Sequence, residues 1–198
     1  GTMIAMVTVG RLAGRVDVRL LILTGLLLTS FSLWEMTLYT TETTAFTIVK
    51  TGVTQGFGLG FIFVPLSTLT FSTLAPKFRN EGTALFSLMR NIGSSIGISM
   101  VVSYLSQRTQ INHAAFADYI TPFNLPLQQA AQSGAFNLDS PTGLAMINAE
   151  VTRQAATLAY LQDFRLMMWI TLAAIPLVLL LRNPSRKPST NSHQAVLE

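Results

Sequence analysis

The chain has 198 residues, of which 49% are hydrophobic and only 11% are charged. Soluble domains carry roughly 25% charged residues, and the mean hydropathy is +0.46, so the composition excludes an ordinary soluble domain and indicates a membrane protein. The net charge of +4 does not indicate nucleic-acid binding, because the basic residues stand in short clusters beside apolar runs rather than in a stripe. With no cysteine and two isolated histidines, no disulfide, metal site or cofactor is predicted.

The chain opens on an apolar stretch without the basic segment and cleavage site of a signal peptide. A membrane helix needs about 20 apolar residues, so we interpret residues 1–9 as the end of a transmembrane helix. We therefore expect the chain to be the C-terminal piece of a longer protein. Residues 10–19, with three arginines and one aspartate, form the next connection.

Four complete membrane spans are predicted after this connection, each long enough to cross the hydrocarbon core. Their expected ranges are 20–38, 47–73, 82–104 and 164–181. The hydrophilic segment 105–163 is expected to be a loop outside the membrane. Ser140 and Pro141 are a capping and first-position pair, so 141–163 can continue as a helix into the last span. Residues 182–198 are expected to be a polar tail.

The positions of the basic residues predict the orientation in the membrane. Eight of them stand in short loops on one side: Arg11, Arg15, Arg19, Lys77, Arg79, Arg182, Arg186 and Lys187. Four are spread over a greater length on the other side: Lys50, Arg108, Arg153 and Arg165. The positive-inside rule then places the connection 10–19 and the C-terminal tail in the cytoplasm. Segment 105–163 is predicted to be extracytoplasmic.

Two spans carry glycines at intervals of four residues, namely Gly52, Gly56 and Gly60 in one and Gly93 and Gly97 in the next. Small residues at this spacing let neighbouring helices approach closely. Close packing alone is the favoured interpretation. The alternative, that these faces let the helices rock during a functional cycle, stays open.

Polar side chains inside the same two spans are candidates for the lining of a substrate cavity. The candidates are Thr51, Gln55, Leu59, Ile62, Arg90 and Asn91. Gln55 shares a helix face with the other three residues of its span, and an interhelical hydrogen bond and a ligand contact are equally favoured for it. Arg90 is expected to face the bundle interior or a water-filled cavity, because an arginine facing lipid is costly.

Other residues are assigned to packing or to the membrane interface. Phe57, Phe61 and Phe63 are expected to contact helices or lipid, in preference to stacking on a ligand. Glu35 is expected to be an interfacial carboxylate, in preference to a proton-carrying site. Asp163 is expected to be interfacial too. The sequence has no carboxylate pair, Ser-His-Asp set or phosphate-binding loop that favours an enzyme.

Three stretches resemble one known family. Residues 10–19, GRLAGRVDVR, resemble the cytoplasmic loop signature of the major facilitator superfamily. Gly10, Leu12, Arg15 and Arg19 fit that signature, whereas Gly14 and Asp17 stand where its aspartate and second glycine are usual. Residues 82–99 and 153–164 are similar to regions of the fourteen-span drug:proton antiporters of the EmrB/QacA type. The resemblance covers nearly the whole chain.

The resemblance implies an all-α polytopic membrane protein, the C-terminal part of a major facilitator superfamily helix bundle with the end of one span and four complete spans. Residues 47–104 would line the central cavity. The connection 10–19 would act as a gating loop, through Gly10, Arg11, Arg15, Asp17 and Arg19. The implied location is the bacterial plasma (inner) membrane.

The implied function is proton-driven multidrug efflux of amphipathic compounds by alternating access around a site near the midplane. The implied partners are the lipid bilayer, small amphipathic substrates, protons and the N-terminal spans of the same protein. The resemblance also suggests a periplasmic adaptor protein as a partner. Three alternatives stay open. They are export of one narrow natural substrate such as a siderophore, peptide or antibiotic, a non-transporting membrane scaffold, and an inactive truncation.

Overall fold

The computed structural model describes residues 1–12, 16–72, 74–121, 125, 128–129 and 140–180. Its elements are α1 (Thr2–Leu12), α2 (Val18–Met36), α3 (Ala45–Ser72), a 3₁₀ turn (Pro76–Phe78), α4 (Arg79–Ala117) and α6 (Pro141–Leu180). No strand occurs in these described ranges. Helices α2, α3, α4 and α6 are long and apolar enough to cross a membrane. The predicted fold class, an all-α polytopic membrane protein, is confirmed.

Two helices extend far into the segment expected to be a loop. Helix α4 continues to Ala117 and α6 begins at Pro141, so much of 105–163 is helical rather than irregular. Residues 98–121 contain neither glycine nor proline, and nothing in that stretch ends a helix. At the start of α6, the Ser140 hydroxyl accepts a hydrogen bond from the Gly143 N–H at 3.0 Å, which satisfies one of the free donors of the first turn.

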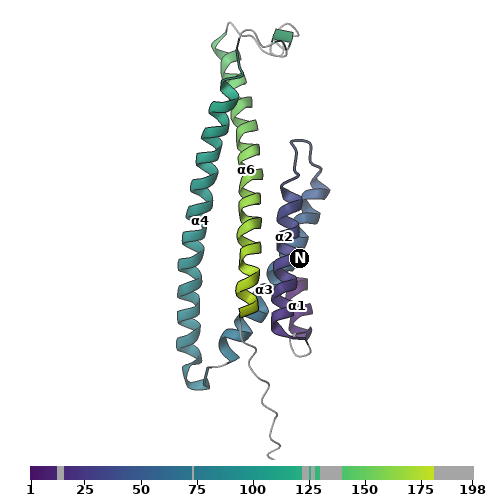
Figure 1. Ribbon diagram of the computed structural model, residues 1–198, viewed down its shortest axis with the longest axis vertical. Helices are drawn as coiled ribbons and strands as arrows, with labels where there is room; N and C mark the ends of the chain where they lie inside the picture. Colours follow the sequence, from purple (N-terminus) through teal and green to yellow (C-terminus); the bar gives the residue numbers. More distant parts are fainter. Residues whose placement is uncertain (13–15, 73, 122–124, 126–127, 130–139, 181–198) are drawn as a thin grey trace, which may run out of the picture.

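The helices form a row in which α6 lies between α4 and the α2–α3 pair (Figure 1). Helix α1 packs on α3, and α6 contacts both α2 and α4. A small apolar core joins α2 and α6 through Ile22, Leu26 and Val178, and Ile62 of α3 packs against it. The α2–α3 pair and α6 are therefore held together at the end where α6 finishes.

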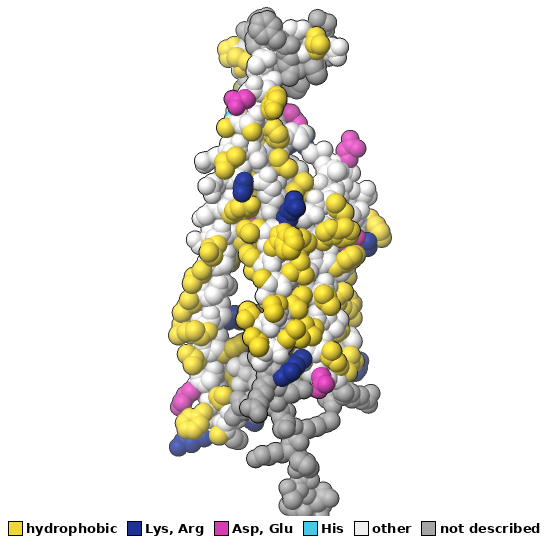
Figure 2. Space-filling view, viewed as in Figure 1, with side chains coloured by type: hydrophobic (Ala, Val, Ile, Leu, Met, Phe, Trp, Pro, Cys, Tyr) yellow, Lys and Arg dark blue, Asp and Glu magenta, His cyan; other side chains and the backbone are white. Residues whose placement is uncertain are grey.

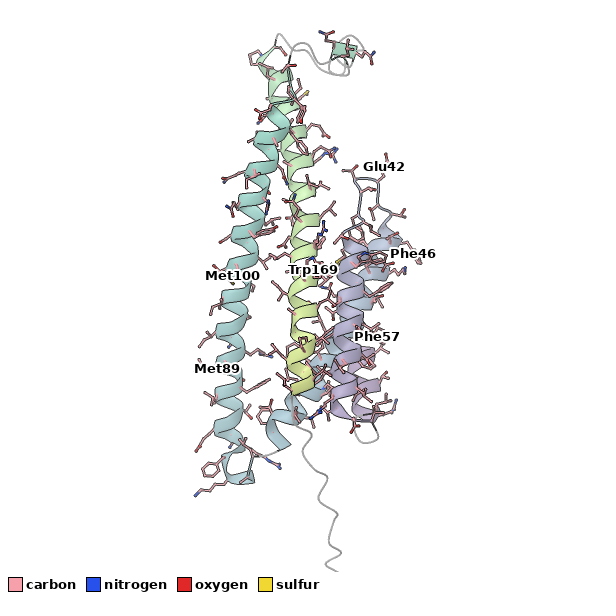
Figure 3. All side chains as sticks on the ribbon, viewed as in Figure 1. Glu42, Phe46, Phe57, Met89, Met100 and Trp169 are labelled. Atoms are coloured by element: carbon pink, nitrogen blue, oxygen red, sulfur yellow. The ribbon has the colours of Figure 1, made fainter. Side chains whose placement is uncertain are left out.

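Helix α4 is the most exposed of the long helices, and no residue of its apolar window is buried inside the structure. Met89 and Met100, 55% and 69% exposed, mark its apolar surface (Figure 3). Figure 2 shows hydrophobic side chains across much of the visible face, with most charged side chains above and below this band. An apolar surface of this extent suits lipid or further membrane helices rather than water.

Candidate functional site

Helices α2 and α3 meet backbone to backbone at Gly25 and Gly58. A Cβ atom placed on Gly25 would lie 2.7 Å from the carbonyl oxygen of Gly58, and one placed on Gly58 would lie 2.8 Å from the carbonyl oxygen of Gly25. Real side chains are not tolerated at such distances, so this contact requires glycine on both helices. Sequence reasoning missed it, although Gly25 and Thr29 form a small-xxx-small pair that could have indicated it.

The five glycines predicted to pack fall into two groups. Gly56 lies against Thr2, and a Cβ on Gly60 would lie 2.5 Å from the Ala5 side chain, so both contact α1. The other three have no neighbour within 4 Å of the position of a Cβ: Gly52, Gly93 and Gly97. Within the described residues, the glycine pair of α4 therefore faces open space.

Thr51 is fully buried in a polar network between α2 and α3. The Ser32 hydroxyl donates to the Thr51 carbonyl oxygen at 2.8 Å, and the Thr51 hydroxyl is hydrogen-bonded to the hydroxyl of Tyr39. These bonds link the C-terminal end of α2, and the residues that follow it, to α3. The side chain of Thr51 therefore points into the contact between the two helices.

The other three candidates on α3 lie in different surroundings. Gln55 is half-buried, Ile62 packs against the core of α2 and α6, and Leu59 is 40% exposed. The four residues predicted to share one face thus do not line one surface. Leu59 and Gln55 retain access to the surface of the structure.

Arg90 reaches from α4 to α3. Its guanidinium carbon lies 6.0 Å from the centre of the Phe63 ring, within the range of a cation–π interaction. Phe71 and Phe86 join the same two helices nearer the turn, with ring centres 5.7 Å apart. Asn91 is exposed, and its carbonyl oxygen accepts a hydrogen bond from the Ser94 hydroxyl at 2.9 Å. The structure therefore brings Arg90 to Phe63, a residue expected only to pack.

The predicted gating loop is partly helical. Gly10 and Arg11 belong to α1, where Arg11 lies in the last turn and complements the helix dipole. Asp17 precedes α2 with an extended backbone, and its carbonyl oxygen accepts a hydrogen bond from the Leu20 N–H at 3.0 Å. Arg19 lies in the first turn of α2, and its Nε is buried without a partner among the described residues. Arg15 lies outside the described residues.

Two carboxylates differ in their surroundings. Glu35 of α2 accepts a hydrogen bond from Lys50 of α3 at 2.5 Å, so its charge is paired near the ends of these helices. Asp163 is only 4% exposed, and its Oδ1 has no hydrogen-bond partner among the described residues. The expectation of an interfacial position did not anticipate this burial. No group of three potential metal ligands occurs among the residues described.

Long apolar helices, close glycine contacts and isolated charges within or beside the spans define a multi-pass helical membrane protein. No family model matches the chain. It is 25% identical over 177 residues to the fatty acid resistance protein FarB of Neisseria gonorrhoeae, covering 89% of this chain and 35% of FarB.

Two further relatives are multidrug proteins by name. The chain is 28% identical over 174 residues to the probable multidrug resistance protein EmrY of Escherichia coli, covering 87% of this chain and 33% of EmrY. It is 24% identical over 149 residues to the multidrug export protein EmrB of Haemophilus influenzae, covering 74% of this chain and 29% of EmrB. The chain thus spans about a third of the length of these relatives.

These matches confirm the resemblance that the three sequence stretches predicted. The chain is similar to EmrB-type multidrug transporters of the major facilitator superfamily.

Proposed function

We propose that this chain is the C-terminal part of a proton-driven efflux transporter that exports amphipathic compounds by alternating access. The observation that carries the proposal is the similarity to FarB, EmrY and EmrB across most of the chain. Secondary transporters bind substrate near the bilayer midplane between bundles that rock around the site. The buried polar and glycine contacts between α1, α2 and α3 suit such a bundle, because they hold these helices together as a unit.

The proposed substrate surface is formed by α3 and α4. Leu59 and Phe63 expose 40% and 42% of their surface, and Arg90 lies over the Phe63 ring. An aromatic ring and an aliphatic side chain suit the hydrophobic part of an amphipathic compound, and a guanidinium binds an anionic group in a planar, bidentate way. The Arg90 charge would then select amphipathic compounds that carry a carboxylate. Gln55 and Asn91 are the proposed polar contacts at the edges of this surface.

The length of α4 and α6 supports a partner outside the membrane. With 39 and 40 residues, each helix is about 60 Å long, whereas the hydrocarbon core is about 30 Å thick. The two helices pack along their extended ends through Asn112, which donates to the Ala155 carbonyl oxygen at 3.3 Å, and through a hydrogen bond between His113 and Asn148. We place the periplasmic adaptor protein at this extension. In this arrangement the connection 10–19 and the C-terminus are cytoplasmic.

Drug susceptibility tests the proposed function. Bacteria without their own efflux pumps would produce the full-length gene product, and minimal inhibitory concentrations would be measured for a long-chain fatty acid, a cationic dye and a neutral antibiotic. We expect a raised inhibitory concentration for at least the fatty acid, lost when a protonophore collapses the proton gradient. Unchanged susceptibility to all three compounds, with the protein present in the membrane, would favour a narrow natural substrate or a non-transporting scaffold.

A further inference from the structure

A groove of about 530 Å³ lies between the end of α2 and one face of α6. Trp34 of α2 and the next turn, Thr37 and Leu38, contribute to it on one side, and Gln162, Arg165 and Trp169 contribute from α6. The α6 residues lie three or four positions apart, so they form one stripe along the helix. Gln162 and Trp169 are about 10 Å apart along the axis at 1.5 Å per residue. Figure 3 labels Trp169 on α6.

The groove contains both of the tryptophans in the chain. Trp34 and Trp169 are 48% and 58% exposed, which is unusual for large aromatic side chains in a water-facing protein. Tryptophan favours the headgroup region of a bilayer, where its ring is amphipathic. Arg165 lies at the start of the expected span 164–181, so the groove is at the level where lipid headgroups meet the hydrocarbon core.

The groove contains one cation, Arg165, which is exposed. Arg165 has no ion pair with any residue that the structure describes. A guanidinium binds phosphate oxygens with two parallel hydrogen bonds. An anionic phospholipid supplies such a phosphate, and its acyl chains suit the exposed apolar side chains beside Arg165.

We propose that this groove binds an anionic phospholipid of the phosphatidylglycerol type. Arg165 binds the phosphate, and an acyl chain lies along Met168 and Trp169. The proposal requires only that α2 and α6 cross a membrane. It does not depend on export by the protein or on which side of the membrane the groove faces.

Native mass spectrometry of the full-length gene product in detergent tests this site. Purified protein would be titrated with phosphatidylglycerol and with phosphatidylcholine of the same acyl chains. We expect phosphatidylglycerol to bind more tightly than phosphatidylcholine. Arg165→Gln should weaken phosphatidylglycerol binding about fivefold, because one cation near anionic lipid contributes about 1 kcal/mol to binding. Arg165→Lys should retain most of the preference because it keeps the charge.

The matched control is Arg153→Gln on the same helix. Arg153 is paired with Glu150 at 2.7 Å and does not line the groove, so its loss should leave phosphatidylglycerol binding unchanged. Equal binding of the two lipids, or an equal loss in both Arg→Gln variants, would overturn the proposal. Displacement of the lipid by millimolar inorganic phosphate would also overturn it, because the site would then bind a free anion. None of these readouts measures export, so failure of the lipid site is distinct from failure of the proposed function.

Discussion

The guanidinium carbon of Arg90 lies 6.0 Å from the centre of the Phe63 ring, and this contact joins α4 to α3. Phe63 is 42% exposed, so the pair lies on a surface rather than in a packed core. The contact gives the Arg90 charge an aromatic neighbour without burying it. That arrangement is why we place the proposed substrate surface here.

The Arg90 and Phe63 pair predicts coupled effects on export. In the full-length gene product, Arg90→Gln and Phe63→Leu should each reduce resistance to an exported amphipathic anion. In a double-mutant cycle on substrate affinity, the coupling between them should be about 0.5–2 kcal/mol. Met89→Leu on the neighbouring position is the control and should behave as the parent protein does. Strictly additive effects would show that the two residues act separately.

The glycine contact between α2 and α3 predicts that the same substitution, glycine to alanine, has different effects at two positions. Gly58→Ala places a methyl group 2.8 Å from the Gly25 carbonyl oxygen, so it should destabilise the protein by roughly 1–3 kcal/mol through overpacking. Gly93→Ala meets nothing within 4 Å and removes a flexible residue from a helix, so it should be neutral or stabilising by up to about 1 kcal/mol. Thermal unfolding of the two variants in detergent measures the difference. Equal midpoints would contradict the contact.

Two serines two positions apart on α2 form a second matched pair. Ser32→Ala removes the hydrogen bond to the Thr51 carbonyl oxygen and should cost about 0.6 kcal/mol, the average for such bonds in membranes. Ser30→Ala should cost less, because the Ser30 hydroxyl is buried without a partner among the described residues. Unfolding in mixed micelles compares the variants. A greater loss of stability in Ser30→Ala than in Ser32→Ala would contradict the stabilising role of the hydrogen bond from Ser32 to Thr51.

The Glu35 and Lys50 pair predicts a small, salt-sensitive contribution to stability. The side chain of Lys50 is 55% exposed and that of Glu35 is 18% exposed, so solvent screens the interaction. A double-mutant cycle with Glu35→Gln and Lys50→Gln should give a coupling of roughly 0.2–1 kcal/mol, lower at high ionic strength. Coupling of several kcal/mol, unaffected by salt, would mean that the pair is buried in the full-length gene product.

The orientation can be tested by cysteine labelling of the full-length gene product, because these 198 residues contain no cysteine and any cysteine elsewhere in that product can be replaced. Ala117→Cys at the end of α4 should react in intact cells with a maleimide that does not cross membranes, since the positive-inside rule places this end outside. Lys77→Cys, in the turn before α4, should react only after permeabilisation. The opposite pattern of labelling would reverse the orientation.

Much of the fold follows from the sequence because a bilayer restricts the choice. Backbone groups in hydrocarbon must be paired internally, so each long apolar run must be a helix. The extension of α4 to Ala117 was less predictable, because a polar helix outside the membrane has the composition of a loop. Ser140 and Pro141 were identified as a helix start by capping chemistry. This signal is local, because it needs only a capping residue followed by proline at the first helical position.

The sequence by itself therefore determined the all-α membrane class and the resemblance to EmrB-type transporters. It also singled out Arg90 as a charge that requires an explanation. Only the tertiary structure decided which glycines are in contact, that Thr51 faces α2, and that Phe63 is the neighbour of Arg90. The physical reason is that spacing along a helix defines its faces, whereas the rotation and crossing of two helices decide which faces meet.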